Sequence, residues 1–223
     1  MNITIPGKVV VFDYGEVISA VPTLQDRAEL LNLAKADPGP FWEAYWRHRK
    51  ALDQWTVDTW GYWTLIQQEL GVEWEPERLH RLWLTDLRGW MRINPDVLDV
   101  LISLQLGGTR MALLSNAGRD YASYFRYGML GSFFDQVFVS GELDALKPSP
   151  EIFHAVLASL DVSPADVIFI DDREENVVGA GNLGIQGHVF TTAAELRSYL
   201  VGLTSPAEVD GLVAAEHSPG GSA

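Results

Sequence analysis

Five short apolar runs recur along the chain, and each is long enough for a strand but too short for a helix. They occupy Lys8–Phe12, Arg110–Leu114, Gln136–Val139, Asp166–Ile170 and Gln186–Phe190. The first run is rich in valine, and short apolar runs of this kind are typical of strands buried inside a sheet. The pattern therefore predicts five buried strands.

Helical patterns separate the later runs. Asn94 and Pro95 are typical of an N-cap followed by the first helical position, and they predict a helix over Asp96–Gln105. Pro150 similarly predicts the start of a helix, and Thr192–Leu203 is a third candidate. Strands that alternate with helices indicate an α/β fold, a Rossmann-like parallel sheet with helices on both faces. In such sheets the chemistry gathers at the carboxyl ends of the strands.

Residues 19–92 break this alternation, because they contain no strand pattern. All eight tryptophans lie between Trp42 and Trp90. The apolar spacing predicts one amphipathic helix from Trp60 to Leu70 and a second around Leu79–Trp83, while residues 37–40 (Asp-Pro-Gly-Pro) indicate a turn. We expect a small helical cap at 19–92, inserted after the first strand of a core formed by 1–18 and 93–203. The tryptophans either pack the core of this bundle or line a substrate pocket below it.

Composition excludes several classes of function. The chain has no cysteine, which excludes disulfides, thiolate zinc sites and cysteine nucleophiles. Its formal net charge of -14 disfavours nucleic acid and anionic membranes as partners. No apolar run is long enough to span a bilayer, and the start of the chain lacks the pattern of a signal peptide, so we expect a cytoplasmic protein. The Gly-, Ser- and Pro-rich segment 204–223 predicts a disordered tail.

Four short segments place chemically useful side chains together in the expected fold. They are VVVFDYGEVI at 9–18, MALLSN at 111–116, LKPSPEIF at 146–153 and VIFIDD at 167–172. Taken singly, Asp13 is also a plausible turn cap, Ser115-Asn116 is ordinary turn chemistry, and Lys147 is a typical surface residue. Two adjacent carboxylates at the end of an apolar strand repel each other, and a cation between them and another acid relieves that repulsion.

In this order the segments resemble the haloacid dehalogenase superfamily, most closely its sugar-phosphate phosphatase branch with a small helical cap. The resemblance implies that Asp13 is a nucleophile that becomes an aspartyl-phosphate, and that Lys147 neutralises nucleophile and phosphate. It implies that Ser115 binds phosphate, with Asn116 beside it. It also implies a Mg²⁺ site formed by Asp13, the backbone carbonyl of Gly15, Asp171 and the supporting Asp172. The implied substrate is a small phosphate ester.

Elementary chemistry agrees with these roles. A carboxylate that attacks a phosphate dianion meets charge repulsion, which Mg²⁺ and an ammonium group offset. One position departs from the usual pattern of the superfamily, in which a second aspartate two residues after the nucleophile protonates the leaving group and activates water. That position is Gly15 here, and Glu16 follows it. In an extended segment the side chain of Glu16 would point to the opposite side. The glycine favours a good leaving group, such as the anomeric oxygen of a hexose 1-phosphate.

Two other functions remain open at this point. A 2-haloacid dehalogenase would use the same aspartate nucleophile on carbon and would need no metal, although the Asp171-Asp172 pair argues against it. A non-catalytic binding domain of the same fold would explain the missing acid at Gly15, but it would not explain the presence together of Asp13, Ser115, Lys147 and Asp171. The pattern does not fix the oligomeric state.

Overall fold

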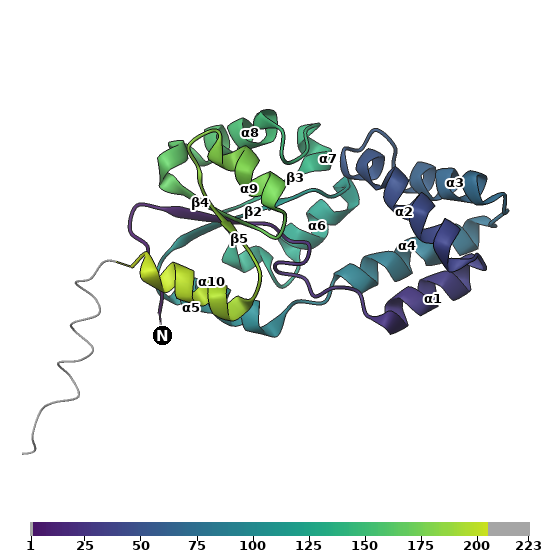
Figure 1. The fold of residues 1–223 in the computed structure, drawn as a ribbon, viewed down its shortest axis with the longest axis horizontal. Coiled ribbons are helices and arrows are strands. Elements are labelled where there is room, and N and C mark those ends of the chain that lie inside the picture. Colours follow the sequence, from purple (N-terminus) through teal and green to yellow (C-terminus); the bar gives the residue numbers. More distant parts are fainter. Residues whose placement is uncertain (1, 205–223) are drawn as a thin grey trace, which may run out of the picture.

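The fold is built on a five-stranded parallel sheet, and the computed structural model describes residues 2–204. The strands are β1 Val9–Phe12, β2 Arg110–Ser115, β3 Gln136–Val139, β4 Val167–Asp171 and β5 Gln186–Val189. They lie in the order β3-β2-β1-β4-β5 (Figure 1). Since β1 is central and pairs in parallel with both β2 and β4, the carboxyl ends of these three strands are neighbours.

Helices cover both faces of this sheet, as the alternating pattern predicts. They are α5 Pro95–Leu106, α6 Arg119–Tyr127, α7 Ser140–Leu143, α8 Pro150–Leu160, α9 Glu174–Gly181 and α10 Ala193–Gly202, with short 3-10 turns at Gly131–Phe133 and Pro164–Asp166. Asn94 caps α5 by accepting from the backbone N–H of Asp96, and Pro150 begins α8, so both predicted helix starts are confirmed.

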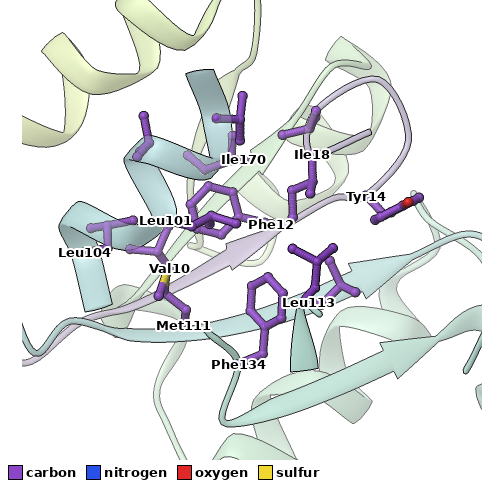
Figure 2. Close-up of a cluster of buried hydrophobic side chains, with 14 of the residues drawn as sticks. Val10, Phe12, Tyr14, Ile18, Leu101, Leu104, Met111, Leu113, Phe134 and Ile170 are labelled. Atoms are coloured by element: carbon purple, nitrogen blue, oxygen red, sulfur yellow. The ribbon is translucent and has the colours of Figure 1, made fainter. Parts of the chain in front are cut away.

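The two faces bury alternate residues of the inner strands, because neighbouring side chains of a strand point in opposite directions. The edge strand β5 has no buried residue, so the prediction of five buried strands is wrong for β5. Val10 and Phe12 of β1 lie in one hydrophobic cluster with Leu101 and other residues of α5, α6 and α10 (Figure 2). Val9 and Val11 lie in a second cluster with residues of α8 and α9. Burial on both faces explains why the strands have so few polar positions.

Four further helices lie between β1 and α5. They are α1 Leu24–Ala34, α2 Pro38–Asp53, α3 Thr59–Leu70 and α4 Pro76–Trp90. They share a third hydrophobic cluster, separate from those of the sheet, and we call these four helices the helical insert. Figure 1 shows the insert at one end of the molecule, beside the sheet rather than on either face.

The structure corrects some of the predicted elements. Asp37 to Pro40 do not form an isolated turn, because Asp37 is the N-cap of α2 and Pro38 occupies its first turn, where proline is tolerated. The pattern missed α1 and α2, as well as α6 and α9. Ser115 and Asp171 are the last residues of their strands rather than the first residues beyond them. The tail predicted at 204–223 lies outside the described residues, apart from Thr204.

The tryptophans of the insert divide between the two roles that the sequence leaves open. The side chain of Trp63 is buried in the third cluster, with 1% of its surface exposed, whereas Trp60 is 48% exposed. Trp46 and Trp90 line a cavity between the insert and the edge of the sheet.

Over residues 2–204, no helix is long and apolar enough to cross a membrane.

Replacing Trp63 should therefore destabilise the insert. Trp63→Ala removes a fully buried ring and should lower the free energy of unfolding by about 3–5 kcal/mol. Trp60→Ala, on the neighbouring exposed face, should change it by less than about 1 kcal/mol. Urea unfolding followed by circular dichroism measures both values. Equal losses for the two variants would show that Trp63 is not a core residue.

Candidate active site

Three neighbouring strands bring predicted site residues to one edge of the sheet. Asp13 follows directly after β1, Ser115 is the last residue of β2, and Asp171 is the last residue of β4. All three residues are buried. Because these strands are parallel and adjacent, residues far apart in the sequence become neighbours at the same edge.

Lys147 joins this group from the loop before α8. Its ammonium nitrogen Nζ lies 2.7 Å from Oδ1 of Asp13 and 2.7 Å from Oδ2 of Asp171, and it donates to the backbone carbonyl of Leu114 at 3.1 Å. The Lys147 side chain is only 1% exposed. The lysine is therefore a buried cation shared between two carboxylates, and not the solvated surface residue that its sequence position alone suggests.

Asn116 supports the loop that carries this lysine. The backbone N–H of Lys147 donates to Oδ1 of Asn116 at 2.9 Å, and Nδ2 of Asn116 donates to the backbone carbonyl of Lys147 at 3.0 Å. Both ends of the amide side chain thus bind the backbone of Lys147. Phosphate binding by Asn116 and Ser115 stays a prediction.

A compact group of three acids lies beside the lysine. Asp13, Asp171 and Asp172 each offer a carboxylate oxygen, and these oxygens lie within 4.8 Å of one another. Oδ1 of Asp171, the oxygen that does not contact Lys147, accepts hydrogen bonds of 2.9 Å from the backbone N–H of Arg173 and from Nδ2 of Asn176. No motif in the sequence singles out Asn176, which lies on the first turn of α9.

The segment after Asp13 turns sharply, which corrects one sequence-based expectation. Glu16 has a φ of 57°, in the left-handed region that is unfavourable for most side chains. The segment is therefore not extended, and Glu16 lines the same cavity as Asp13 and Gly15 instead of pointing away. Burial, the charge of Asp171 and the charge of Glu16 together raise the pKa of Asp172.

The cavity above these residues has a volume of about 1050 Å³ and extends to the helical insert. Its walls include Trp46, Arg49 and Asp53 of α2, and Trp90 at the end of α4. The tryptophan-rich pattern of the insert indicates residues such as Trp46 and Trp90, but nothing in it indicates Arg49, because the pattern missed α2. The insert and the sheet edge thus form one cavity.

Comparison with known proteins identifies the family. The model of the haloacid dehalogenase-like hydrolases matches residues 8–184, most of the described chain. The chain belongs to the haloacid dehalogenase-like hydrolase family. This match includes every predicted site residue, and it confirms both the predicted resemblance and the predicted class, a hydrolase.

Within this family, the curated relatives differ in activity. The chain is 28% identical over 151 residues to (S)-2-haloacid dehalogenase 1 of a Pseudomonas strain, with 62% of this chain and 66% of the relative covered. It is 31% identical over 119 residues to the sesquiterpene phosphatase astK of Aspergillus oryzae, covering 51% and 60%. It is 27% identical over 99 residues to glyceraldehyde 3-phosphate phosphatase of Methanopyrus kandleri, covering 43% and 42%. The matches thus span about two thirds of these relatives or less.

Solved structures of the family share the fold. A HAD family enzyme of Bacteroides thetaiotaomicron, crystallised with magnesium and inorganic phosphate, has a TM-score of 0.68 at 20% identity, covering 82% of this chain and 94% of that one. The L-2-haloacid dehalogenase of Xanthobacter autotrophicus has a TM-score of 0.62 at 23% identity, covering 92% and 87%. Both comparisons support the α/β architecture, and they do not separate phosphatase from dehalogenase.

The electrostatics of this HAD-like site favour a charged lysine. Burial opposes the charge of Lys147, but the nearby carboxylates of Asp13 and Asp171 outweigh it and raise the pKa of the ammonium group. Burial raises the pKa of Asp13, while Lys147 acts in the opposite direction. Removing the lysine would leave buried carboxylates facing each other without a cation.

We therefore predict that Lys147→Met destabilises the metal-free protein by about 3 kcal/mol or more, because a buried ion pair loses one partner. The control is Lys8→Met, since Lys8 forms a partly exposed ion pair of 4.0 Å with Asp166 and an exposed hydrogen bond to the backbone carbonyl of Ala165. That change should alter the free energy of unfolding by less than about 1 kcal/mol. Urea unfolding in the presence of a chelator measures both. Wild-type stability of Lys147→Met would contradict the buried ion pairs.

Proposed function

We propose that this chain is a Mg²⁺-dependent phosphatase that hydrolyses a small phosphate ester, with Asp13 carrying the phosphoryl group between two chemical steps. The observation that supports this most strongly is a group of three clustered acids, two of which, Asp13 and Asp171, pair with the buried ammonium of Lys147. Two of the curated relatives are named as phosphatases. A structural neighbour binds magnesium and inorganic phosphate in its crystal.

The residues present fit a magnesium ion. Carboxylate oxygens are the hard ligands that Mg²⁺ prefers, and Asp13, Asp171 and Asp172 offer three of them close together. Gly15 lies in the same loop and would offer a backbone carbonyl. When bound there, Mg²⁺ would offset the negative charge of the phosphate and of Asp13.

The proposed reaction has two steps. In the first, a carboxylate oxygen of Asp13 attacks phosphorus, and the bond from phosphorus to the leaving oxygen breaks. Lys147 holds Asp13 in place and stabilises the negative charge on the phosphoryl oxygens, while Ser115 lies at the adjacent strand end to receive one of them. In the second step water attacks the phosphoryl group, the bond from phosphorus to Asp13 breaks, and the proton that water loses passes to solvent.

Gly15 bears on which ester reacts. It has no side chain that could protonate the leaving oxygen, so a leaving group that departs readily is favoured. The anomeric oxygen of a hexose 1-phosphate is such a group. Glu16 lines the same cavity and carries the nearest carboxylate in the sequence after Asp13 that could move a proton.

A dehalogenase is the second candidate, because a curated relative and a structural neighbour are 2-haloacid dehalogenases. That reaction uses an aspartate nucleophile on carbon and has no need of three clustered carboxylates. The grouping of Asp13, Asp171 and Asp172 therefore favours the phosphatase. Halide release from 2-chloropropionate that survives a chelator would favour the dehalogenase instead. A non-catalytic domain would show neither activity.

The role of Asp13 is tested by Asp13→Asn, which keeps the shape of the side chain but removes the attacking carboxylate. Turnover of an aryl phosphate should fall by about 10⁴-fold or more, without loss of fold. Asp135→Asn is the control, because Asp135 pairs with Arg110 at the opposite end of β2. If Asp13→Asn kept more than a tenth of wild-type turnover, Asp13 could not be the nucleophile.

The metal site is tested by removing either the ion or a ligand. A chelator should abolish phosphate release, and added Mg²⁺ should restore it. Asp171→Ala should weaken Mg²⁺ binding, measured directly by calorimetry, by about tenfold or more. Asp135→Ala should bind the ion like the wild type. If the chelated enzyme keeps full activity, the proposal of a magnesium-dependent reaction is wrong.

A further inference from the structure

Two charged side chains of α2 face the cavity from the insert. Arg49 and Asp53 are one helical turn apart, and Nε of Arg49 donates to Oδ1 of Asp53 at 2.9 Å. Their side chains are only 13% and 14% exposed, and both line the cavity that contains Asp13. Such buried charges need a reason, because burying an ion pair is costly and seldom stabilises a fold.

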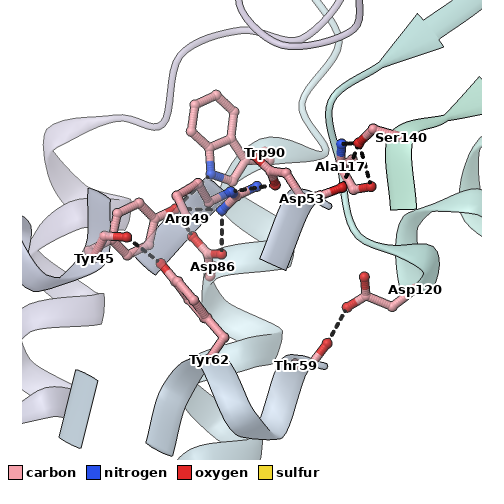
Figure 3. Close-up of polar contacts among 10 residues, drawn as sticks. All are labelled: Tyr45, Arg49, Asp53, Thr59, Tyr62, Asp86, Trp90, Ala117, Asp120 and Ser140. Atoms are coloured by element: carbon pink, nitrogen blue, oxygen red, sulfur yellow. Dashed lines mark hydrogen bonds and ion pairs between the residues drawn. The ribbon is translucent and has the colours of Figure 1, made fainter. Parts of the chain in front are cut away.

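A network behind Arg49 fixes the guanidinium group in place (Figure 3). Its Nη1 donates to the hydroxyl of Tyr45 at 3.0 Å and to Oδ2 of Asp86 at 3.4 Å. The hydroxyl of Tyr45 in turn donates to Oδ1 of Asp86 at 2.7 Å and accepts from Nε1 of Trp90 at 3.2 Å. Residues from α2 and α4 thus hold the arginine, and little of its side-chain entropy remains to be lost when a ligand binds.

The network leaves one donor group and one acceptor unused. Within residues 2–204, neither Nη2 of Arg49 nor Oδ2 of Asp53 forms a hydrogen bond. Neither atom is sealed from solvent, because the unpaired buried side-chain atoms of the described chain belong to Asp120 and His188. Arg49 and Asp53 therefore present adjacent N–H donors and a carboxylate acceptor to the cavity. A hydroxyl group both donates and accepts, so this pair matches one or two neighbouring hydroxyls.

The charge of the cluster selects against an anion at this position. The single positive charge of Arg49 faces the two carboxylates of Asp53 and Asp86, and the other cation that acts on Asp53, Arg173, has a side chain that is 62% exposed and therefore screened by solvent. A carboxylate or second phosphate of a substrate would meet a positive charge that is already compensated, and it would lie beside the oxygen of Asp53. An uncharged hydroxyl meets no such repulsion. The pair therefore suits a polar but neutral ligand group.

The position of Asp53 is fixed relative to the phosphate end of the cavity. The hydroxyl of Ser140 donates to the backbone carbonyl of Asp53 at 2.6 Å and accepts from the backbone N–H of Ala117 at 2.9 Å (Figure 3). Ala117 lies two residues after Ser115, which ends strand β2 and carries the predicted phosphate-binding hydroxyl. One serine thus ties the end of α2 to the loop that follows β2.

Aromatic walls complete the surroundings of the pair. Trp46 and Trp90 line the same cavity, with ring centroids 6.5 Å apart and the ring planes nearly perpendicular. A sugar has faces of C–H groups, which pack on aromatic rings, and edges of hydroxyls, which need donors and acceptors. The insert offers both kinds of surface at one place.

We propose that Arg49 and Asp53 bind hydroxyl groups of an uncharged, polyhydroxylated leaving group, so that the enzyme selects sugar phosphates over esters whose leaving group carries a carboxylate. This inference rests on the proposed phosphatase activity and names the substrate class of the same site. It makes Arg49 and Asp53 the specificity-determining residues of the insert.

The test compares four kinds of phosphate ester: aldohexose and pentose phosphates, their deoxy analogues, 2-phosphoglycolate and an aryl phosphate. The wild type should prefer a sugar phosphate to 2-phosphoglycolate, and removal of one hydroxyl should lower kcat/KM by about tenfold or more. Asp53→Asn should lower kcat/KM for that sugar phosphate by a similar factor, mainly through KM. It should leave kcat/KM for the aryl phosphate within about threefold, and it should reduce the preference over the deoxy analogue.

Asp120→Asn is the matched control. Asp120 is a partly buried carboxylate that accepts from Thr59 and Trp83 and joins the insert to α6, but it lies outside the cavity. Any effect of this variant should be the same for all esters. Equal losses on every ester in Asp53→Asn, or a preference for 2-phosphoglycolate in the wild type, would overturn the proposal.

A binding measurement separates this inference from the proposed reaction. Calorimetry on Asp13→Asn, with no further change, should show that a sugar phosphate binds about tenfold more tightly than a deoxy analogue. If that holds while the wild type hydrolyses no ester, the phosphatase proposal fails and the hydroxyl site stands. If the aryl phosphate is hydrolysed but the sugar phosphates and their deoxy analogues bind equally, or do not bind, the hydroxyl site fails and the phosphatase stands.

Discussion

The ammonium group of Lys147 lies 2.7 Å from Asp13 and 2.7 Å from Asp171, and these two ion pairs are the contacts on which the rest of the site depends. Without a cation, two carboxylates could not both stay ionised at the buried edge of a sheet. The amide of Asn116 holds the backbone of Lys147 from both sides, and Asn176 orients Asp171. The same grouping of charges suits a phosphoryl group and a divalent ion.

The parallel sheet explains why so much of the core can be predicted from the sequence. Buried parallel strands are short and apolar, and the five runs found in the sequence are the five strands, although the edge strand β5 is not buried. Polar residues at the ends of parallel strands lie at one edge, so the strand pattern places Asp13, Ser115 and Asp171 at that edge, and the strand order makes them neighbours. Lys147 is harder to place from physical reasoning alone, because nothing local shows that the loop before α8 folds back over the strand ends. The family resemblance supplies its role.

The insert and the loop after Asp13 are less predictable, and for physical reasons. Helices α1 and α2 carry many polar residues and only a narrow apolar stripe. Their charged positions resemble those of any solvated helix. Whether Arg49 and Asp53 face water or a cavity depends on how the insert packs against the sheet edge, which is a long-range property. The contact of Ser140 with the end of α2 sets that geometry. The left-handed turn at Glu16 likewise has no local signal, since glycine or asparagine is the usual residue there.

Transfer of the phosphoryl group to Asp13, as proposed, is detected by acid-quenched rapid mixing with an aryl phosphate. Gly15 has no side chain to activate water, so breakdown of the phosphorylated enzyme should be slower than its formation with a good leaving group. We expect a burst of about one alcohol per active site, with the phosphoryl group found on the peptide that contains Asp13. Different good leaving groups should then give the same slow steady rate. Linear release of alcohol, with no phosphoryl group on Asp13 at any time, would show that Asp13 is not the nucleophile.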